Sequence, residues 1–403
     1  MSWIKRFQGF LLLLLLFPLI ARASFIESTM GAAVVNDATA TYYNPSALVL
    51  LKNPQIIALG SSIYFRSHFT GQAIQSTTGF MQSGNSSTQT HYFLPSFYLA
   101  MPATDKITVG LAVISNFFNT SIEENSILRY AQSSNNVQDI DLVPAVGIKL
   151  NKIFSFGAGI NFSYASFVLQ PISGFPSLNI PDSQSRNTCN GTGVGGDIGF
   201  LVNPADTTLI GFNYRSAVTY SLNGKSILAS NPEIISDHYG YHFWTPARSV
   251  ISVNQSITSS LGVIGTIQRV QWDIFKDINI HGIVTQIGSR ASILNADVPY
   301  HLHNTWILTI GSHYRLTPKW IIRAAATYNE SPGNSNFQIT TGNSIIAGAS
   351  IGYKICKDVI VDGSYAHAFI QNESINITTG SNMIKGLNKS YLDAVSLKIT
   401  FNF

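Results

Sequence analysis

The sequence predicts an all-β protein: a 14-stranded antiparallel transmembrane β-barrel with a small N-terminal hatch plugging its lumen. Three observations support this fold. Only 11% of the residues are charged, against about 25% in typical globular domains. Long segments alternate apolar and polar residues with the period of a β-strand. The connectors alternate strictly between short and long, as do the turns and loops at the two ends of an outer-membrane barrel.

The first residues resemble a secretion signal. Lys5 and Arg6 precede the apolar run Phe10–Ile20, and Ala21-Arg22-Ala23 follows as a small-residue cleavage site. A transmembrane helix needs about 20 apolar residues, so this run is too short to span a bilayer. We therefore expect residues 1–23 to be a cleaved signal peptide.

The charge of the mature chain argues against nucleic acid as a partner. The formal net charge is +4. The signal peptide contributes Lys5, Arg6 and Arg22 and no acid, which leaves 4 − 3 = +1. The remaining sequence contains no basic tract or stripe of the kind that binds phosphate backbones.

The C-terminal segment LDAVSLKITFNF predicts a membrane strand. Val395, Leu397, Ile399, Phe401 and Phe403 fall on one face, and polar residues fall on the other. Strict alternation with a terminal aromatic residue is typical of barrels in the outer membrane of Gram-negative bacteria. We expect a multi-pass monomer in that membrane, surrounded by its lipid and folded by the barrel assembly machinery.

The periodicity predicts fourteen strands, an even number as single-chain bacterial barrels require. They span 55–69, 91–101, 106–118, 138–150, 152–168, 194–203, 207–222, 241–257, 261–280, 303–315, 320–330, 343–354, 358–370 and 391–403. The long connectors between them, such as 70–90 and 371–390, are rich in Ser, Asn, Thr and Gly. We expect residues 54–403 to form the barrel and these connectors to be extracellular loops.

Residues 24–53 precede the first strand and lack its alternation. Fourteen strands enclose a lumen too wide for wall side chains to fill, since about eight strands is the limit for that. The segment is apolar and carries turn residues, including Asn44-Pro45. It is therefore expected to be a hatch inside the barrel rather than a disordered tail.

The stretch GAAVVNDATATYYNPSALVLL resembles the hatch of the FadL family of long-chain fatty acid transporters, which also includes aromatic-hydrocarbon channels. Further similar motifs follow in the same order along the whole mature chain: VGLAVISNF, NKIFSFGAGINFSYA, FNYRS, QWDIF, WIIRAAATYNESP and DVIVDGSYAHAF. The resemblance implies passive transport of long-chain fatty acids or other hydrophobic molecules across the outer membrane.

The resemblance also implies a route and its residues. Substrate would be captured between the loops 169–193 and 223–240, bind in the lumen, and leave sideways through the wall after the hatch shifts. Phe25 matches the aromatic residue that fills the lumen pocket. The hatch motif matches Asn44, Pro45 and Ser46, and the kinked gate in the third strand matches Ser115, Asn116 and Phe117.

Three departures from the family pattern concern the hatch motif, the gate and the ligand. Ser46 replaces an alanine, and Phe118 stands where a kink would favour glycine. The best-known member of the family carries a lumen arginine just beyond the fifth strand, whereas residues 165–171 here contain no basic residue. Arg215 or Arg323 could instead bind the carboxylate of a substrate, and a neutral hydrophobic substrate remains an alternative.

The sequence does not suggest an enzyme or a cofactor. It has no G-x-S-x-G motif. His367 and Tyr365 share a strand face, whereas Ser364 lies on the other. An outer-membrane lipase or acyltransferase remains an alternative, for which a Ser and a His on neighbouring strands would have to face lipid at one height. A nonspecific diffusion porin is a further alternative, for which the lumen would have to be rich in charges.

Two pairs of residues invite other interpretations. Cys189 and Cys356 fall at opposite ends of the predicted barrel, so we expect them to be unpaired. His301 and His303 share a strand face without a nearby acid or cysteine, so we expect no metal site there.

Overall fold

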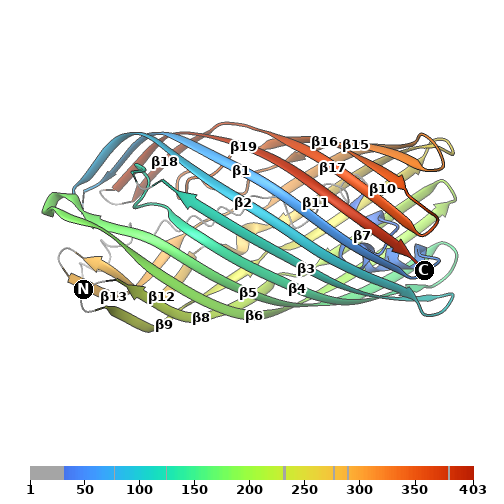
Figure 1. Cartoon of the computed structure of the whole chain (residues 1–403), viewed down its shortest axis with the longest axis horizontal. Helices are drawn as coiled ribbons and strands as arrows, with labels where there is room; N and C mark the ends of the chain where they lie inside the picture. Colours follow the sequence, from blue (N-terminus) through green and yellow to red (C-terminus); the bar gives the residue numbers. More distant parts are fainter. Residues whose placement is uncertain are drawn as a thin grey trace.

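The computed structural model describes residues 31–76, 78–123, 125–229, 233–275, 277–287, 290–379 and 382–403. The chain forms one closed antiparallel barrel of fourteen strands (Figure 1). The barrel closes where the first strand pairs with the last, from Gln55 opposite Asn402 to Gln75 opposite Asn382. Among the described residues no helix is long and apolar enough to cross a membrane.

The barrel is built from 19 β-segments, because several strands are interrupted. Segments β7 and β8, β9 and β10, β11 and β12, β13 and β14, and β17 and β18 each follow one another along a single barrel strand. The segments are β1 (Gln55–Gln75), β2 (Phe80–Pro102), β3 (Ile107–Ile122), β4 (Ser133–Lys149), β5 (Phe154–Phe175), β6 (Ile180–Ala205), β7 (Thr208–Arg215), β8 (Val218–Leu228), β9 (Ile234–Thr245), β10 (Ala247–Ser256), β11 (Leu261–Gln271), β12 (Asp277–Ile287), β13 (Arg290–Pro299), β14 (Thr305–Arg315), β15 (Trp320–Asn329), β16 (Ser344–Lys354), β17 (Val359–Ile370), β18 (Glu373–Thr379) and β19 (Asn382–Asn402). Short 3-10 helices η4 (Pro176–Leu178) and η5 (Trp272–Ile274) lie between segments.

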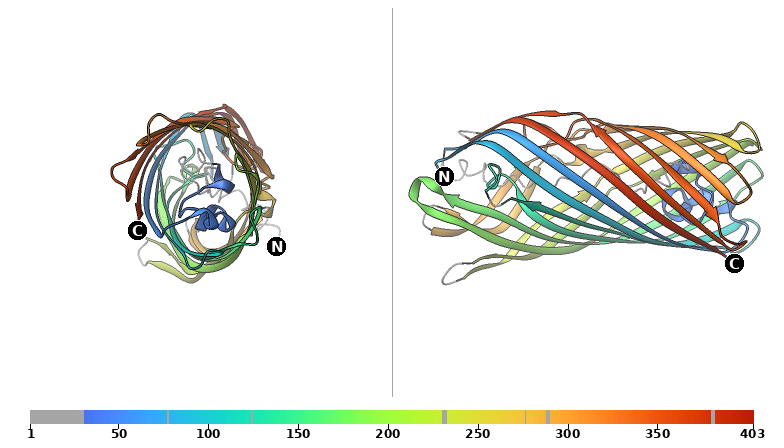
Figure 2. Two further views of the ribbon diagram at one scale, coloured as in Figure 1. Left: turned by 90° about the vertical axis from the view of Figure 1, so that its right-hand side faces the viewer. Right: turned by 45° about the horizontal axis from the view of Figure 1, so that its top comes forward.

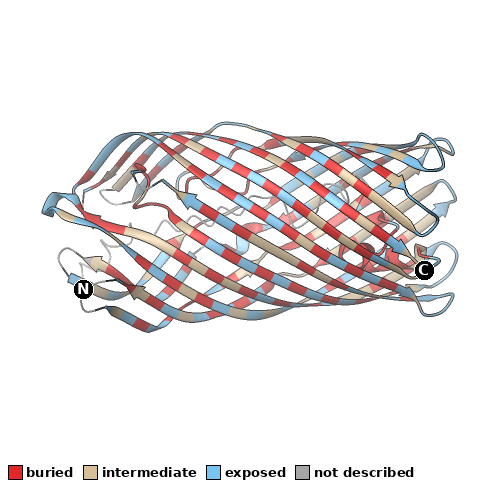
Figure 3. Ribbon diagram, viewed as in Figure 1, coloured by how far each residue is buried: buried red, intermediate tan, exposed pale blue. Residues whose placement is uncertain are grey.

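The predicted alternation appears as a checkerboard of buried and exposed residues on the wall (Figure 3). In β19 the side chains of Val395, Leu397 and Phe401 are exposed, whereas Ser396 and Lys398 are buried on the lumen side. Apolar residues therefore face outward at membrane height and polar residues face inward, the pattern of a barrel whose outer surface contacts lipid.

Short turns connect the strands at one end, and their residues explain why the turns are tight. Thr104, Asn151, Thr258 and Thr317 each accept backbone N–H bonds from residues two and three positions ahead. Such local side-chain bonds replace ladder bonds that the chain gives up when it reverses. The C-terminus lies at this end of the barrel (Figure 1).

The long connectors are mostly strand rather than loop, which corrects the sequence prediction. The β1–β2 ladder continues from Gln55 opposite Ala100 to Gln75 opposite Phe80. The segments 169–193 and 223–240 likewise contain the ends of β5, β6, β8 and β9. Their polar composition indicated loops, but beyond the membrane both faces of a strand can be wet, so polar residues are compatible with a ladder there.

The segment before β1 packs inside the barrel near the short-turn end (Figure 2). It contains η2 (Ala32–Val34), α2 (Ala40–Tyr43) and η3 (Pro45–Leu50). Its short helices contact mainly the wall from β2 to β7 and β10. We call the described residues 31–53 the hatch.

Candidate functional site: the hatch and the lumen

The motif Asn44-Pro45-Ser46 forms the centre of the hatch. Asn44 is the N-cap of η3, and its Oδ1 accepts hydrogen bonds from the Ser46 backbone N (3.2 Å) and Ser46 Oγ (2.7 Å). Pro45 occupies the first position of this helix, where its missing N–H leaves no donor unsatisfied. The Asn44 Nδ2 group donates to the carbonyls of Ala33 (2.7 Å) and Phe200 (3.4 Å), so it connects two parts of the hatch to β6. Ser46 therefore adds a hydrogen bond that the family's alanine would lack.

Glycines on five successive strands let the hatch approach the wall. They are Gly110, Gly147, Gly157, Gly199 and Gly211. A Cβ on Gly157 would lie 2.1 Å from the Ser46 backbone nitrogen, and one on Gly199 would lie 1.9 Å from Asn44 Oδ1. Any side chain at these two positions would overlap the hatch, so this part of the wall is shaped as its seat.

Arg215 lies in the lumen directly above the hatch. Its guanidinium stacks 3.8 Å from the centroid of the Tyr42 ring and donates to the Tyr42 carbonyl at 2.5 Å. It also forms an ion pair with Asp197 of β6. The Arg215 charge is thus neutralised and fixes hatch to wall, although its Nε and Nη1 atoms have no hydrogen-bond partner among the described residues.

A second ion pair secures the hatch on its other side. Lys398 of β19 donates to Asp37 Oδ2 at 2.9 Å, and the Asp37 Oδ1 atom accepts from Thr39 N at 3.0 Å. Burial raises the pKa of the Asp37 carboxyl, but the Lys398 ammonium and Thr39 outweigh that effect, and the pKa lies below its ordinary value. The carboxylate is therefore ionised at neutral pH.

Above the hatch the lumen is lined by aromatic side chains. Phe167, Phe243 and Phe275 form a chain of ring contacts with centroids 5.2 and 5.6 Å apart. Tyr92 and Phe118 stack at 4.9 Å on the adjoining wall. The Tyr239 hydroxyl is buried and has no hydrogen-bond partner within the described chain. These side chains belong to one buried apolar cluster inside the barrel, and aromatic rings of this kind can stack on an apolar molecule.

The predicted gate in the third strand coincides with a gap in the ladder. Pairing of β2 with β3 stops between Phe93–Phe117 and Ser96–Ile114, so Ser115 and Asn116 have no partner on β2. Pro95 lies opposite Ser115 and has no N–H to donate. The pairing of β3 with β4 is continuous through the same residues. Phe118 does not form the kink; it faces the lumen and is 2% exposed.

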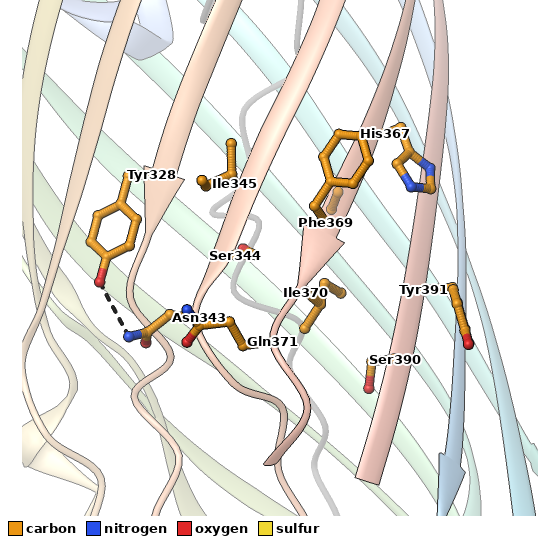
Figure 4. Close-up of a pocket in the computed structure, with 11 residues that line it drawn as sticks. Tyr328, Asn343, Ser344, Ile345, His367, Phe369, Ile370, Gln371, Ser390 and Tyr391 are labelled. Atoms are coloured by element: carbon orange, nitrogen blue, oxygen red, sulfur yellow. Dashed lines mark hydrogen bonds between the residues drawn. The ribbon is translucent and has the colours of Figure 1, made fainter.

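The wall is also interrupted between β17 and β19, and the β4–β5 ladder skips two pairs beside Pro144. The β17–β19 ladder stops at Phe369 opposite Tyr391 and resumes in β18 at Glu373 opposite Asn388. A cavity of about 420 Å³ opens at this point. Figure 4 shows Phe369 and Tyr391 among the residues that line it, together with the hydrogen bond between Tyr328 and Asn343.

The remaining residues singled out in the sequence have separate positions. Phe25 lies outside the described residues. Arg323 faces the lumen at the short-turn end and pairs with Asp362 at 2.8 Å. Cys189 is buried in β6 and Cys356 is exposed in a turn; both are unpaired, as expected. Residues His301 and His303 lie between β13 and β14 rather than on a strand, which corrects that placement.

One feature relevant to the hydrolase alternative was not found in the sequence. Ser62 of β1 and His91 of β2 are exposed on the outer face, with Oγ and Nε2 2.8 Å apart. Register could have indicated it, because His91 pairs with Tyr64, two residues from Ser62. Within the described ranges His91 has no carboxylate or amide partner, so the pair lacks the third group that orients a catalytic histidine. No group of three or more His, Cys, Asp or Glu side chains able to hold a metal occurs in the described part of the chain.

Residues 28–403 match the family model described as outer membrane protein transport protein (OMPP1/FadL/TodX). The chain belongs to this family. The FadL resemblance and the outer-membrane location predicted from the sequence are thereby confirmed.

Curated relatives and solved structures agree with the assignment. A protein of Neisseria meningitidis serogroup B is 23% identical over 430 residues, covering 94% of this chain and 92% of its own. A long-chain fatty acid transport protein of Escherichia coli O6:H1 is 20% identical, covering 83% and 82%. Among structures, a Pseudomonas aeruginosa FadL homologue has a TM-score of 0.80 at 18% identity, covering 93% and 96% of the two chains. The Ralstonia pickettii toluene transporter TbuX has a TM-score of 0.66 at 16% identity, covering 91% and 94%. At these identities the structures show a shared fold.

Proposed function

We propose that this member of the FadL/TodX family carries long-chain fatty acids or similarly hydrophobic molecules across the outer membrane passively. The observation that carries the proposal is the aromatic lumen above a docked hatch. Each CH₂ group gains about 0.8 kcal/mol when it moves from water to an apolar surface. The alkyl chain of a substrate, which is poorly solvated in a water-filled pore, can therefore enter this lumen. The named relatives include both fatty acid and toluene transporters. They support a hydrophobic substrate, either with a carboxylate head group or without one.

The proposed route has three steps. Substrate enters between the hairpins of 169–193 and 223–240, moves along the aromatic lumen, and leaves sideways at Ser115, Asn116 and Phe117 once the hatch shifts. In this proposal Phe25 contacts the substrate in the lumen and Asn44-Pro45-Ser46 hold the closed hatch. No covalent step is needed, which agrees with the incomplete Ser62–His91 pair.

Expression in a Gram-negative host that lacks fatty acid import should restore oleate uptake. Deletion of residues 24–28, which contain Phe25, should lower that uptake because an apolar contact in the lumen is lost. Ser62→Ala is the matched control, since it removes only the outer-face hydroxyl, and it should transport normally. A correctly folded wild-type barrel without oleate or toluene uptake would contradict the proposal, and loss of activity in Ser62→Ala alone would favour the hydrolase.

The lateral exit can be tested by closing the ladder gap. In a Cys189→Ala/Cys356→Ser background, Pro95→Cys and Ser115→Cys would stand opposite each other across the gap, because the register is the same on both sides of it. Oxidation should abolish most uptake, and reduction should restore it. A disulfide between Met101→Cys and Val109→Cys, paired on the same ladder outside the gap, is the control. Unchanged uptake in the oxidised gap variant would show that substrate leaves elsewhere.

A further inference from the structure

A cavity of about 590 Å³ lies between the hatch and the wall at the short-turn end. Val34 and Asn36 line it from the hatch, and residues of β14, β15 and β16 line it from the wall. The glycine seat of the hatch lies on β3 to β7, so the strands β14, β15 and β16 that line the cavity lie outside that seat. We refer to it as the exit cavity because it lies at the short-turn end of the barrel; it is distinct from the lateral gate at β3.

The exit cavity is strongly basic. Its lining includes His313, Arg315, Lys319, Arg323 and Lys354, and it includes no acidic residue. Arg323 is paired with Asp362, which lies behind Gly352; a Cβ on Gly352 would be 2.4 Å from the Asp362 carboxylate. Arg315, Lys319 and Lys354 form no ion pair with a described residue. These three cations are exposed at the edge of the cavity, and their shared positive charge favours an anion there.

The floor of the exit cavity is apolar. Val34, Ile264, Ile321 and Ile360 contribute aliphatic side chains to the same lining. A free inorganic anion would gain nothing from these contacts. An anionic head group that is attached to a hydrocarbon chain would use both surfaces.

We propose that the exit cavity binds the carboxylate of an amphiphilic substrate, with Arg315, Lys319 and Lys354 as its partners. The inference rests on the proposed transport function and narrows it, because it assigns an anionic rather than a neutral cargo. Arg315 can bind a carboxylate through two parallel N–H bonds, and the lysines add charge without fixed geometry. It also places a binding site beside the hatch, on the β14–β16 side, away from the β3 gate.

The test compares oleate with oleyl alcohol, which has the same chain without the charge, on the detergent-solubilised full-length protein. Wild type should bind oleate at least tenfold more tightly. The triple variant Arg315→Gln/Lys319→Gln/Lys354→Gln should lose about tenfold in oleate affinity, because the carboxylate loses its charged partners. It should keep its affinity for the alcohol.

The matched control is Lys106→Gln/Lys149→Gln/Lys152→Gln, which removes the same charge from exposed positions at the same end of the barrel beside β3 to β5. It should bind oleate like wild type. Equal losses in both triple variants would overturn the proposal, because they would reflect only the general charge of the rim. Equal affinity of wild type for oleate and the alcohol would also overturn it, while leaving transport of hydrophobic molecules intact. Binding of neither ligand would instead contradict the proposed function.

A photoreactive fatty acid with a diazirine next to its carboxyl group locates the site. Labelling should fall on residues 313–323 or on Lys354. Excess oleate should displace the probe, and dioleoylphosphatidylglycerol in the same micelles should not. Displacement by the phospholipid alone would identify the cavity as a lipid head-group site and overturn the assignment to substrate.

Discussion

Replacing Asp37 by asparagine should release the hatch from the wall at β19. The Asp37 carboxylate and the Lys398 ammonium are 2.9 Å apart, and Lys398 is only 1% exposed. Removing one partner of a buried ion pair typically costs about 3–5 kcal/mol, because the other charge loses its compensation in a site with little water. Hydrogen exchange of residues 31–53 should therefore become faster in Asp37→Asn, while exchange in the barrel strands stays slow.

Two further variants separate this ion pair from general damage. Lys398→Met should release the hatch similarly. The double variant Asp37→Asn/Lys398→Met should be less affected than the sum of the two, since it leaves no unpaired charge behind. Asp105→Asn, at an exposed turn, should change nothing. Unchanged exchange in Asp37→Asn would show that the pair does not hold the hatch.

The pH dependence of the same contact follows from the lowered pKa of Asp37. A carboxyl whose pKa is lowered in the folded state stabilises that state fully above its ordinary pKa of about 4. The stabilisation is lost as the pH falls from there through the lowered pKa. Hatch exchange in wild type should thus be independent of this group from pH 5 to 8 and increase in stronger acid, and Asp37→Asn should lack that increase.

The barrel could be predicted from the sequence because every membrane strand must show the same alternation of apolar and polar residues. Apolar side chains must point to the lipid and polar side chains to the lumen. A shift of one residue would exchange the two faces. Val395, Leu397 and Phe401 were therefore assigned to one face from sequence alone. Polar strands beyond the membrane carry no such constraint, which is why the segments around Gln75 and Phe80 were expected to be loops.

The candidate sites were harder to predict from the sequence, since they depend on contacts between segments that are distant in the chain. Asn44 and Pro45 were recognised by motif, but their fit against Gly157 and Gly199 depends on barrel register. The Asp37–Lys398 pair joins residues 361 positions apart. No local pattern marks either residue. The exit cavity likewise appears only when the turn after β14 is brought next to the hatch.

Replacing Gly157 by valine should dislodge the hatch from its seat on the wall. A Cβ at this position would lie 2.1 Å from the Ser46 backbone nitrogen and 2.3 Å from the Pro45 carbonyl carbon. Both atoms are backbone, so no side-chain rotation can relieve the overlap, and valine adds two methyl groups beyond the Cβ. Overpacking of this kind typically costs about 1–3 kcal/mol even where neighbours can move.

The expected result for Gly157→Val is a folded barrel whose residues 31–53 exchange rapidly and are cut by added protease. Gly363→Val is the matched control, because nothing lies within 4 Å of a Cβ there, and its hatch should stay protected. If residues 31–53 of Gly157→Val stay protected from exchange and protease, the wall has moved instead of the hatch. The glycine seat would then not determine where the hatch lies. If the hatch is released and oleate uptake falls, the docked hatch contributes to the substrate path; if uptake rises, the hatch limits the flow through the lumen.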